Sequence, residues 1–217
     1  EVLTVQYGDQ IMAPGDGFSV TRFFIVGDGT VDSIAAYAWE LRGGKALGEC
    51  RVALTGIGEG NPAGDIVVEA LLDSEEDAKL AHISAANPDG YGTALLHLPP
   101  GTYDLHISRP GAPSATIEGV EVESGVLKEM PHLLAQPGRI HALVSDQFGA
   151  PMTAKLSLQP GHGAAWAAGI QQIVLVRDGD FTAPVFPGEY TATLSRGFEY
   201  DIHQEDITVV AGETVNV

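Results

Sequence analysis

Hydrophobic and polar residues alternate in short runs along most of the chain. In the run 190–195, side chains two positions apart share one face of a strand, so Tyr190, Ala192 and Leu194 are expected to face a core. The run 103–107 has the same alternation. Runs of about 4–8 residues, punctuated by Gly, Pro, Asn and Asp, are typical of β-sandwiches. The pattern therefore predicts an all-β fold.

A motif that opens two of these runs occurs twice. Pro99-Pro-Gly-Thr-Tyr103 returns as Phe186-Pro-Gly-Glu-Tyr190, with the matching glycines 87 residues apart. Upstream, we align Asp89-Gly90 with Asp178-Gly179, because Asp-Gly suits a tight turn between paired strands. The tyrosine after each Pro-Gly is expected to carry its ring into a core and leave its hydroxyl at the rim. The repetition indicates two tandem units of one architecture.

We expect three parts in the chain. Residues 1–44 are expected to form two strands and a short helix that end a preceding domain or act as a linker. The helix is predicted to have an Asp or Ser cap at residues 32–33 and to stop at Gly43. Residues 45–133 would then form the first β-sandwich, and residues 134–217 the second.

The second unit carries a recognisable order of motifs: Gly138-Arg-Ile, Gly149-Ala-Pro-Met-Thr-Ala-Lys-Leu, Asp178-Gly-Asp-Phe181 and Phe186-Pro-Gly-Glu-Tyr190. This order is similar to the carboxypeptidase regulatory-like domain, a transthyretin-like (prealbumin-like) seven-stranded Greek-key sandwich. The first unit departs from it, with Tyr91 where the family usually has Phe. The resemblance implies two tandem Greek-key β-sandwiches.

A second resemblance concerns the end of one strand in the second unit. The stretch Leu194-Ser-Arg-Gly-Phe-Glu-Tyr200, followed by an acidic strand, looks like the sandwich region upstream of the catalytic domain in CehA/McbA-type PHP-superfamily metallohydrolases. The catalytic motifs of that superfamily are not in this sequence. The resemblance implies a segment accessory to a metal-dependent hydrolase domain, in a larger, extracytoplasmic (periplasmic or secreted) bacterial protein.

The composition removes several classes of partner. The net charge of −18 would repel a phosphate backbone, so nucleic acid is not expected to bind; the acidity is interpreted as a solvated surface. No window approaches the roughly 20 apolar residues of a membrane helix, so no membrane insertion is expected. Cys50 is the sole cysteine, which excludes an intramolecular disulfide, and we expect it to be a small core residue.

The candidate metal chemistry is sparse. None of the seven histidines pairs with another at the spacing of a zinc site, so no catalytic residue, metal ligand or cofactor is expected among them. Asp178 and Asp180, and separately the acidic loop 73–77, carry the hard oxygen ligands that Ca²⁺ prefers. The favoured alternative is that the aspartates of Asp178-Gly-Asp180 serve a hairpin turn.

The connection 159–169 is longer than a turn requires, and it carries His162 and Trp166. An exposed Trp166 would stack on a sugar ring or wedge against a neighbouring domain. The favoured alternative is that Trp166 caps its own sandwich.

The leading functional hypothesis is a non-catalytic spacer and docking segment whose partners are neighbouring domains of the same chain. The runner-up is a module that binds carbohydrate or a cell-surface protein through its sandwich loops. An enzyme contained within these residues ranks third.

Overall fold

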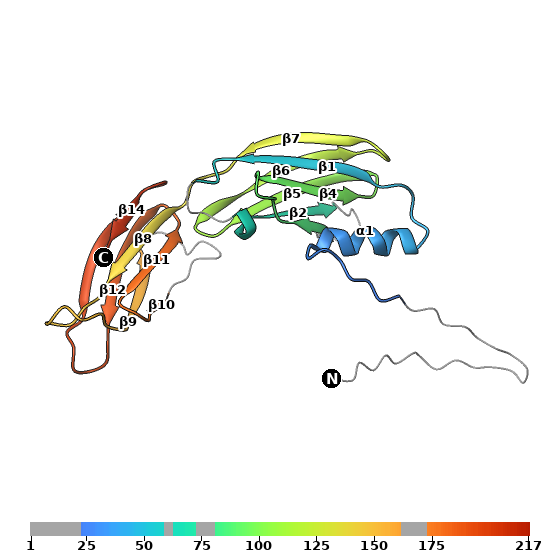
Figure 1. Cartoon of the computed structure of the whole chain (residues 1–217). Helices are drawn as coiled ribbons and strands as arrows, with labels where there is room; N and C mark the ends of the chain where they lie inside the picture. The colour runs from blue at the N-terminus through green and yellow to red at the C-terminus, as the bar shows by residue number, and fades with distance from the viewer. Residues whose placement is uncertain (1–22, 59–62, 73–80, 162–172) are drawn as a thin grey trace, which may run out of the picture.

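The computed structural model describes residues 23–58, 63–72, 81–161 and 173–217 of the chain. These residues form one α-helix, α1 (Val31–Leu41), and strands β1–β14, which are arranged in four sheets. Figure 1 shows the sheets as two sandwiches in series, with α1 beside the first. The all-β fold class expected from the alternation is confirmed.

The first sandwich consists of a three-stranded sheet, in the order β4–β1–β7, and a four-stranded sheet, in the order β3–β2–β5–β6. In the first sheet β1 pairs antiparallel with β4 and parallel with β7. The elements are β1 (Gly48–Thr55), the short 3-10 helix η1 (Ala63–Asp65), β2 (Val67–Leu72), β3 (Ala81–Ala86), β4 (Thr93–Leu98), β5 (Gly101–Arg109), β6 (Ala112–Val122) and β7 (Leu127–Leu133).

The second sandwich repeats this topology strand for strand. Its sheets have the orders β11–β8–β14 and β10–β9–β12–β13, and β8 pairs antiparallel with β11 and parallel with β14. The strands are β8 (Gly138–Leu143), β9 (Ala154–Pro160), β10 (Ile173–Val176), β11 (Asp180–Val185), β12 (Gly188–Ser195), β13 (His203–Val209) and β14 (Thr214–Asn216). The domain boundaries at residues 44/45 and 133/134 stay predictions.

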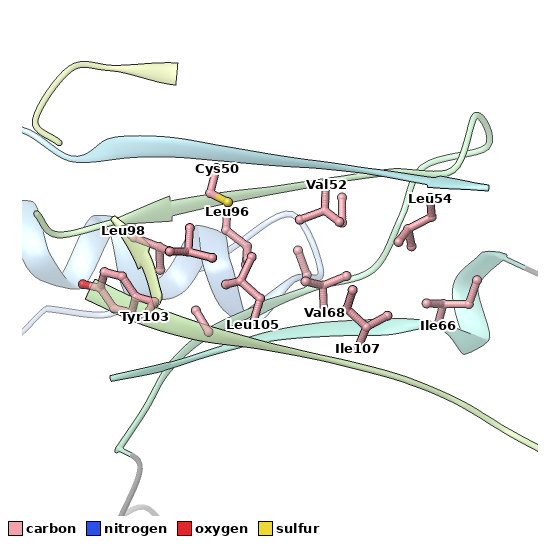
Figure 2. Close-up of a cluster of buried hydrophobic side chains, with 14 of the residues drawn as sticks. Cys50, Val52, Leu54, Ile66, Val68, Leu96, Leu98, Tyr103, Leu105 and Ile107 are labelled. Atoms are coloured by element: carbon pink, nitrogen blue, oxygen red, sulfur yellow. The ribbon is translucent and has the colours of Figure 1, made fainter. Parts of the chain in front are cut away.

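Each sandwich encloses its own apolar core. In the first, Val52, Leu96 and Leu105 are among the side chains without solvent exposure, and Figure 2 shows them between the two sheets. In the second, Ile140 and Leu156 belong to a separate cluster. Every second residue of β5 and of β12 is buried, because the sheet hides one face of each strand and exposes the other.

Tyr103 and Tyr190 lie at equivalent places in the two cores. Only 2% of Tyr103 and 5% of Tyr190 is exposed, which confirms that both rings enter a core. Their hydroxyls do more than reach the rim: Tyr103 donates to the carbonyl of Pro99 (2.7 Å), and Tyr190 to that of Phe186 (3.0 Å). Each tyrosine therefore fastens the Pro-Gly turn that precedes it to the core.

The alignment of Gly90 with Gly179 is wrong by two residues. Gly92 is the equivalent residue, because its carbonyl accepts from Leu54 as the carbonyl of Gly179 accepts from Val144. Gly92 and Gly179 both have the positive φ that favours glycine, at +82° and +74°. Asp89 accounts for the longer turn, since its carboxylate accepts from the backbone N–H groups two and four residues later.

The short helix predicted before Gly43 is present as α1, but it begins at Val31 and a different residue caps it. Thr30, and neither residue of the predicted pair 32–33, is the N-cap, and its side chain accepts from the Ser33 N–H. Hydrogen bonds from the Thr30 hydroxyl and backbone lower the pKa of Asp28. After the helix, Gly43 turns the chain with a φ of +73°, as the sequence predicted.

Two strands were expected ahead of the helix. Most of that region lies outside the described residues. The second strand was expected over residues 18–26, and its described end, residues 23–26, has no regular structure. In the part of the chain that the structure describes, no helix is long and apolar enough to span a membrane.

Candidate functional site

The polar cluster that most resembles a reactive site lies where α1 meets the first sandwich. The helix contacts β3 and β4, the two edge strands of the first sandwich that face each other across its open side. Asp32, in the first turn of the helix, points toward these strands and is only 4% exposed. A buried carboxylate has to be paired or fully hydrogen-bonded, because it has lost its water.

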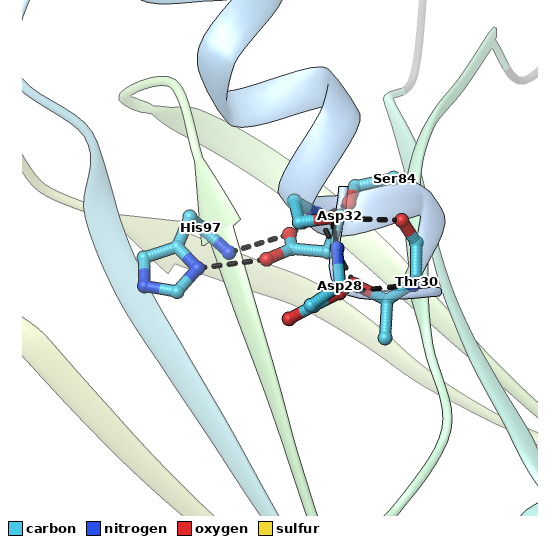
Figure 3. A network of polar contacts seen from close by, with 6 residues as sticks. Asp28, Thr30, Asp32, Ser84 and His97 are labelled. Atoms are coloured by element: carbon cyan, nitrogen blue, oxygen red, sulfur yellow. Dashed lines mark hydrogen bonds and ion pairs between the residues drawn. The ribbon is translucent and has the colours of Figure 1, made fainter. Parts of the chain in front are cut away.

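Asp32 finds three partners (Figure 3). Its Oδ1 accepts from the Ser84 hydroxyl and from the His97 backbone N–H, each at 2.7 Å. Its Oδ2 lies 2.7 Å from Nδ1 of the His97 ring. Ser84 is on β3 and His97 on β4, so one carboxylate connects the helix to both strands.

The geometry decides what this cluster can do chemically. A carboxylate accepts, so Nδ1 of His97 is the donor, and Nε2 lies on the far side of the ring from Asp32 in Figure 3. A hydrolytic triad would need a hydroxyl on that second nitrogen. The Ser84 hydroxyl is bonded to Asp32 instead, so the three residues form a clamp for the helix.

A cavity of about 530 Å³ opens beside the clamp, between α1 and the segment that leads into β1. The Trp39 indole N–H donates to the Lys45 carbonyl (2.7 Å), which fixes one wall of the cavity. The lining combines apolar groups, such as Ala36 and Leu47, with the aromatic ring of Tyr37 and the carboxylates of Asp32 and Glu40. A concave site of this size is suited to a small ligand.

Asp178 and Asp180 lie at the turn into β11, and both are exposed. The hairpin expected here is wrong, because β10 pairs with β9 and β11 pairs with β8, in two different sheets. Asp180 Oδ1 lies 3.0 Å from Nε2 of His141, whose Nδ1 lies 3.2 Å from Oδ1 of Asn216. Within the described residues, no three His, Cys, Asp or Glu side chains come together as a metal site would need. A calcium role for Asp178 and Asp180 stays a prediction.

The other predicted binding residues, His162 and Trp166, lie outside the described residues, as does the acidic loop 73–77. Sequence reasoning missed the clamp. The sequence indicates Asp32 only as a helix cap, and His97 only as one of seven histidines that lack the spacing of a zinc site. The two are 65 residues apart, so no local spacing could have linked them.

Cys50 is expected to be unreactive in the folded protein. The residue is fully buried on β1, and burial raises the pKa of its thiol to about 11. At pH 8 the thiolate, which is the reactive form, would therefore be scarce as well as inaccessible. We expect a disulfide reagent such as dithionitrobenzoate to leave the native chain unmodified and to react with one thiol per chain after denaturation. Rapid reaction of the native chain would contradict the burial.

The comparisons with known proteins give structural likenesses only. No protein-family model matches the chain, and no curated protein matches it. A putative adhesin from Bacteroides ovatus is similar at 9% identity and a TM-score of 0.38, over 90% of this chain and 95% of that one. A streptococcal ancillary pilin is similar at 13% and 0.36, and the Bacillus anthracis TIE protein at 16% and 0.32, each over 79% of this chain. The chain spans 61% of that pilin chain and 33% of the TIE chain.

Proposed function

We propose that the chain is a non-catalytic structural segment, a spacer and docking surface within a larger extracytoplasmic protein. The observation that carries the proposal is that Asp32, Ser84 and His97 are bonded to one another in a structural arrangement. Their hydrogen bonds hold α1 against the open side of the first sandwich, and the serine hydroxyl is not presented to the imidazole. The repetition of one sandwich in series supports the same role, because it extends the chain without adding a second kind of site.

An activity assay with a matched stability measurement tests the proposal. The full chain, supplied with Zn²⁺ or Mn²⁺, is expected to release no nitrophenol from nitrophenyl esters or phosphates above the buffer rate. His97→Ala is expected to leave that baseline unchanged and to lower the melting temperature, because it removes a partner of the buried Asp32 carboxylate. Turnover by the wild-type chain that His97→Ala abolishes would refute the proposal.

An accessory role beside a PHP-type metallohydrolase domain is the finer form of this proposal. It rests on the resemblance of the stretch 194–200 alone. Sequencing the gene on both sides of the present 217 residues tests it, since a histidine- and aspartate-rich catalytic domain would have to be encoded there.

Binding of a carbohydrate or a cell-surface protein is the second candidate function. The cavity beside α1 favours it, because Tyr37 and Trp39 stand next to carboxylates there, and aromatic rings with a few polar groups are what such ligands need. A binding role of the loop 159–169 stays a prediction. Quenching of tryptophan fluorescence by glycans, lost in Trp39→Phe and kept in Trp166→Phe, would support the cavity over the loop.

A further inference from the structure

The segment between the two sandwiches is bonded to both of them. Leu134 is buried in the first core, and its N–H donates to the last residue of β1 (2.9 Å). The Gln136 side-chain amide donates to the carbonyl of Gly56. The carbonyl of Pro137 accepts from Gly212 of the second sandwich (2.8 Å). Only a few residues lie between these anchors, so little of the linker is left to bend.

A second connection comes from the turn between β5 and β6. Arg109, at the end of β5, is 8% exposed, and its guanidinium donates to the carbonyls of Gly56 and Ile57, both at 3.1 Å. Burial lowers the pKa of this arginine. The two bonds hold the base of the turn, and the next residues, Pro110 and Gly111, project to the second sandwich.

Gly111 meets the backbone of β11. A Cβ atom at this position would lie 2.6 Å from the carbonyl carbon of Pro184, a separation that would force the turn or the strand to shift. The contact is close because position 111 has no side chain, and its φ of +72° is also one that glycine adopts at little cost.

The turn reaches the side of the second sandwich that α1 covers in the first. There, between β10 and β11, a hollow of about 360 Å³ leads into the second core, and Asp65, Pro110 and Gly111 of the first sandwich form part of its wall. The remaining lining is apolar and includes Val174 of β10 and Phe181 and Pro184 of β11. The helix α1 therefore covers the side between β3 and β4 in the first sandwich, and the β5–β6 turn covers the equivalent side between β10 and β11 in the second.

We propose that the β5–β6 turn docks on the β10–β11 side of the second sandwich and locks the two sandwiches into one rigid body. Domains joined by a free linker move relative to each other by default. Here the linker 134–137 and the β5–β6 turn each contact the second sandwich, at Gly212 and at Pro184. Rotation of the sandwiches about one of these contacts is blocked by the other. The inference rests on the proposed spacer function. A rigid spacer would hold the parts of the protein at its two ends at a fixed angle to each other.

Spin labels across the joint test the proposal in the full chain. Labels at Glu121→Cys and Thr208→Cys, both exposed, would report the separation of the sandwiches by pulsed electron resonance, and buried Cys50 would stay unlabelled. The wild-type background is expected to give one narrow distance distribution. Gly111→Val is expected to broaden it at least two-fold, because the new side chain strikes Pro184.

Gly119→Val is the matched control. Gly119 also has a positive φ, +67°, but a Cβ there would meet nothing within 4 Å. Valine at 119 therefore reproduces the backbone strain without the collision, and it should leave the distribution narrow. A broad distribution in the wild-type background, or equal distributions for the two valine variants, would overturn the rigid joint. Neither result would bear on catalysis, which the turnover assay tests separately.

Discussion

Replacing Tyr103 or Tyr190 by Ala is expected to lower the free energy of unfolding by about 3–5 kcal/mol, the range for removing an aromatic ring from a core. Each ring is buried in a different core, and each hydroxyl holds a Pro-Gly turn. The loss should be confined to one sandwich at first, so hydrogen exchange would accelerate in β1–β7 for Tyr103→Ala and in β8–β14 for Tyr190→Ala. Urea denaturation gives the magnitude.

Phe at the same positions separates the ring from the hydroxyl. Tyr103→Phe and Tyr190→Phe keep the ring and remove one hydrogen bond, a loss of about 0.5–1.5 kcal/mol. Burial raises the pKa of both tyrosines, so the stability gained from the neutral phenol is present below the ordinary value of 10.0 and is lost as the pH rises through the higher folded-state value. The Phe variants should lack this alkaline loss. Equal destabilisation by Ala and Phe would contradict the claim that the buried ring contributes most of the stability.

Asp32→Ala is expected to release α1 from the first sandwich. The change leaves the Ser84 hydroxyl and the His97 backbone N–H without their acceptor, and an unsatisfied buried group costs about 1–3 kcal/mol. The amides of α1 should then lose protection from hydrogen exchange, while the strands of the second sandwich keep theirs. Glu40→Ala, an exposed change on the same helix, is the control. Unchanged protection of α1 in Asp32→Ala would show that the clamp does not hold the helix.

The strands, and which of their residues are buried, could be predicted from the sequence because the alternation of apolar and polar residues is visible in each local run. The run 190–195 is an example, since each expected core residue in it is buried. The repeat extended this prediction to both sandwiches. The shift between Gly90 and Gly92 could not be predicted, because either glycine of the stretch 89–93 suits a turn and only the cross-strand hydrogen bond selects one.

The candidate site was beyond prediction for a different reason. Asp32, Ser84 and His97 belong to three elements far apart in the chain, and each has an ordinary local explanation. The same holds between the two sandwiches. Position 111 has to be glycine because of its close contact with Pro184, a residue of the other sandwich. Contacts of this kind follow from how the sandwiches pack, and alternation carries no information about that.

Residual dipolar couplings of the wild-type chain would show whether the two sandwiches form one rigid spacer. Backbone N–H couplings would be measured for β1–β7 and for β8–β14 in the same weakly aligned sample. One alignment tensor is expected to fit both sets, with the sandwiches oriented as in Figure 1. Two tensors of different magnitude, one for each sandwich, would show that they move independently and would contradict it.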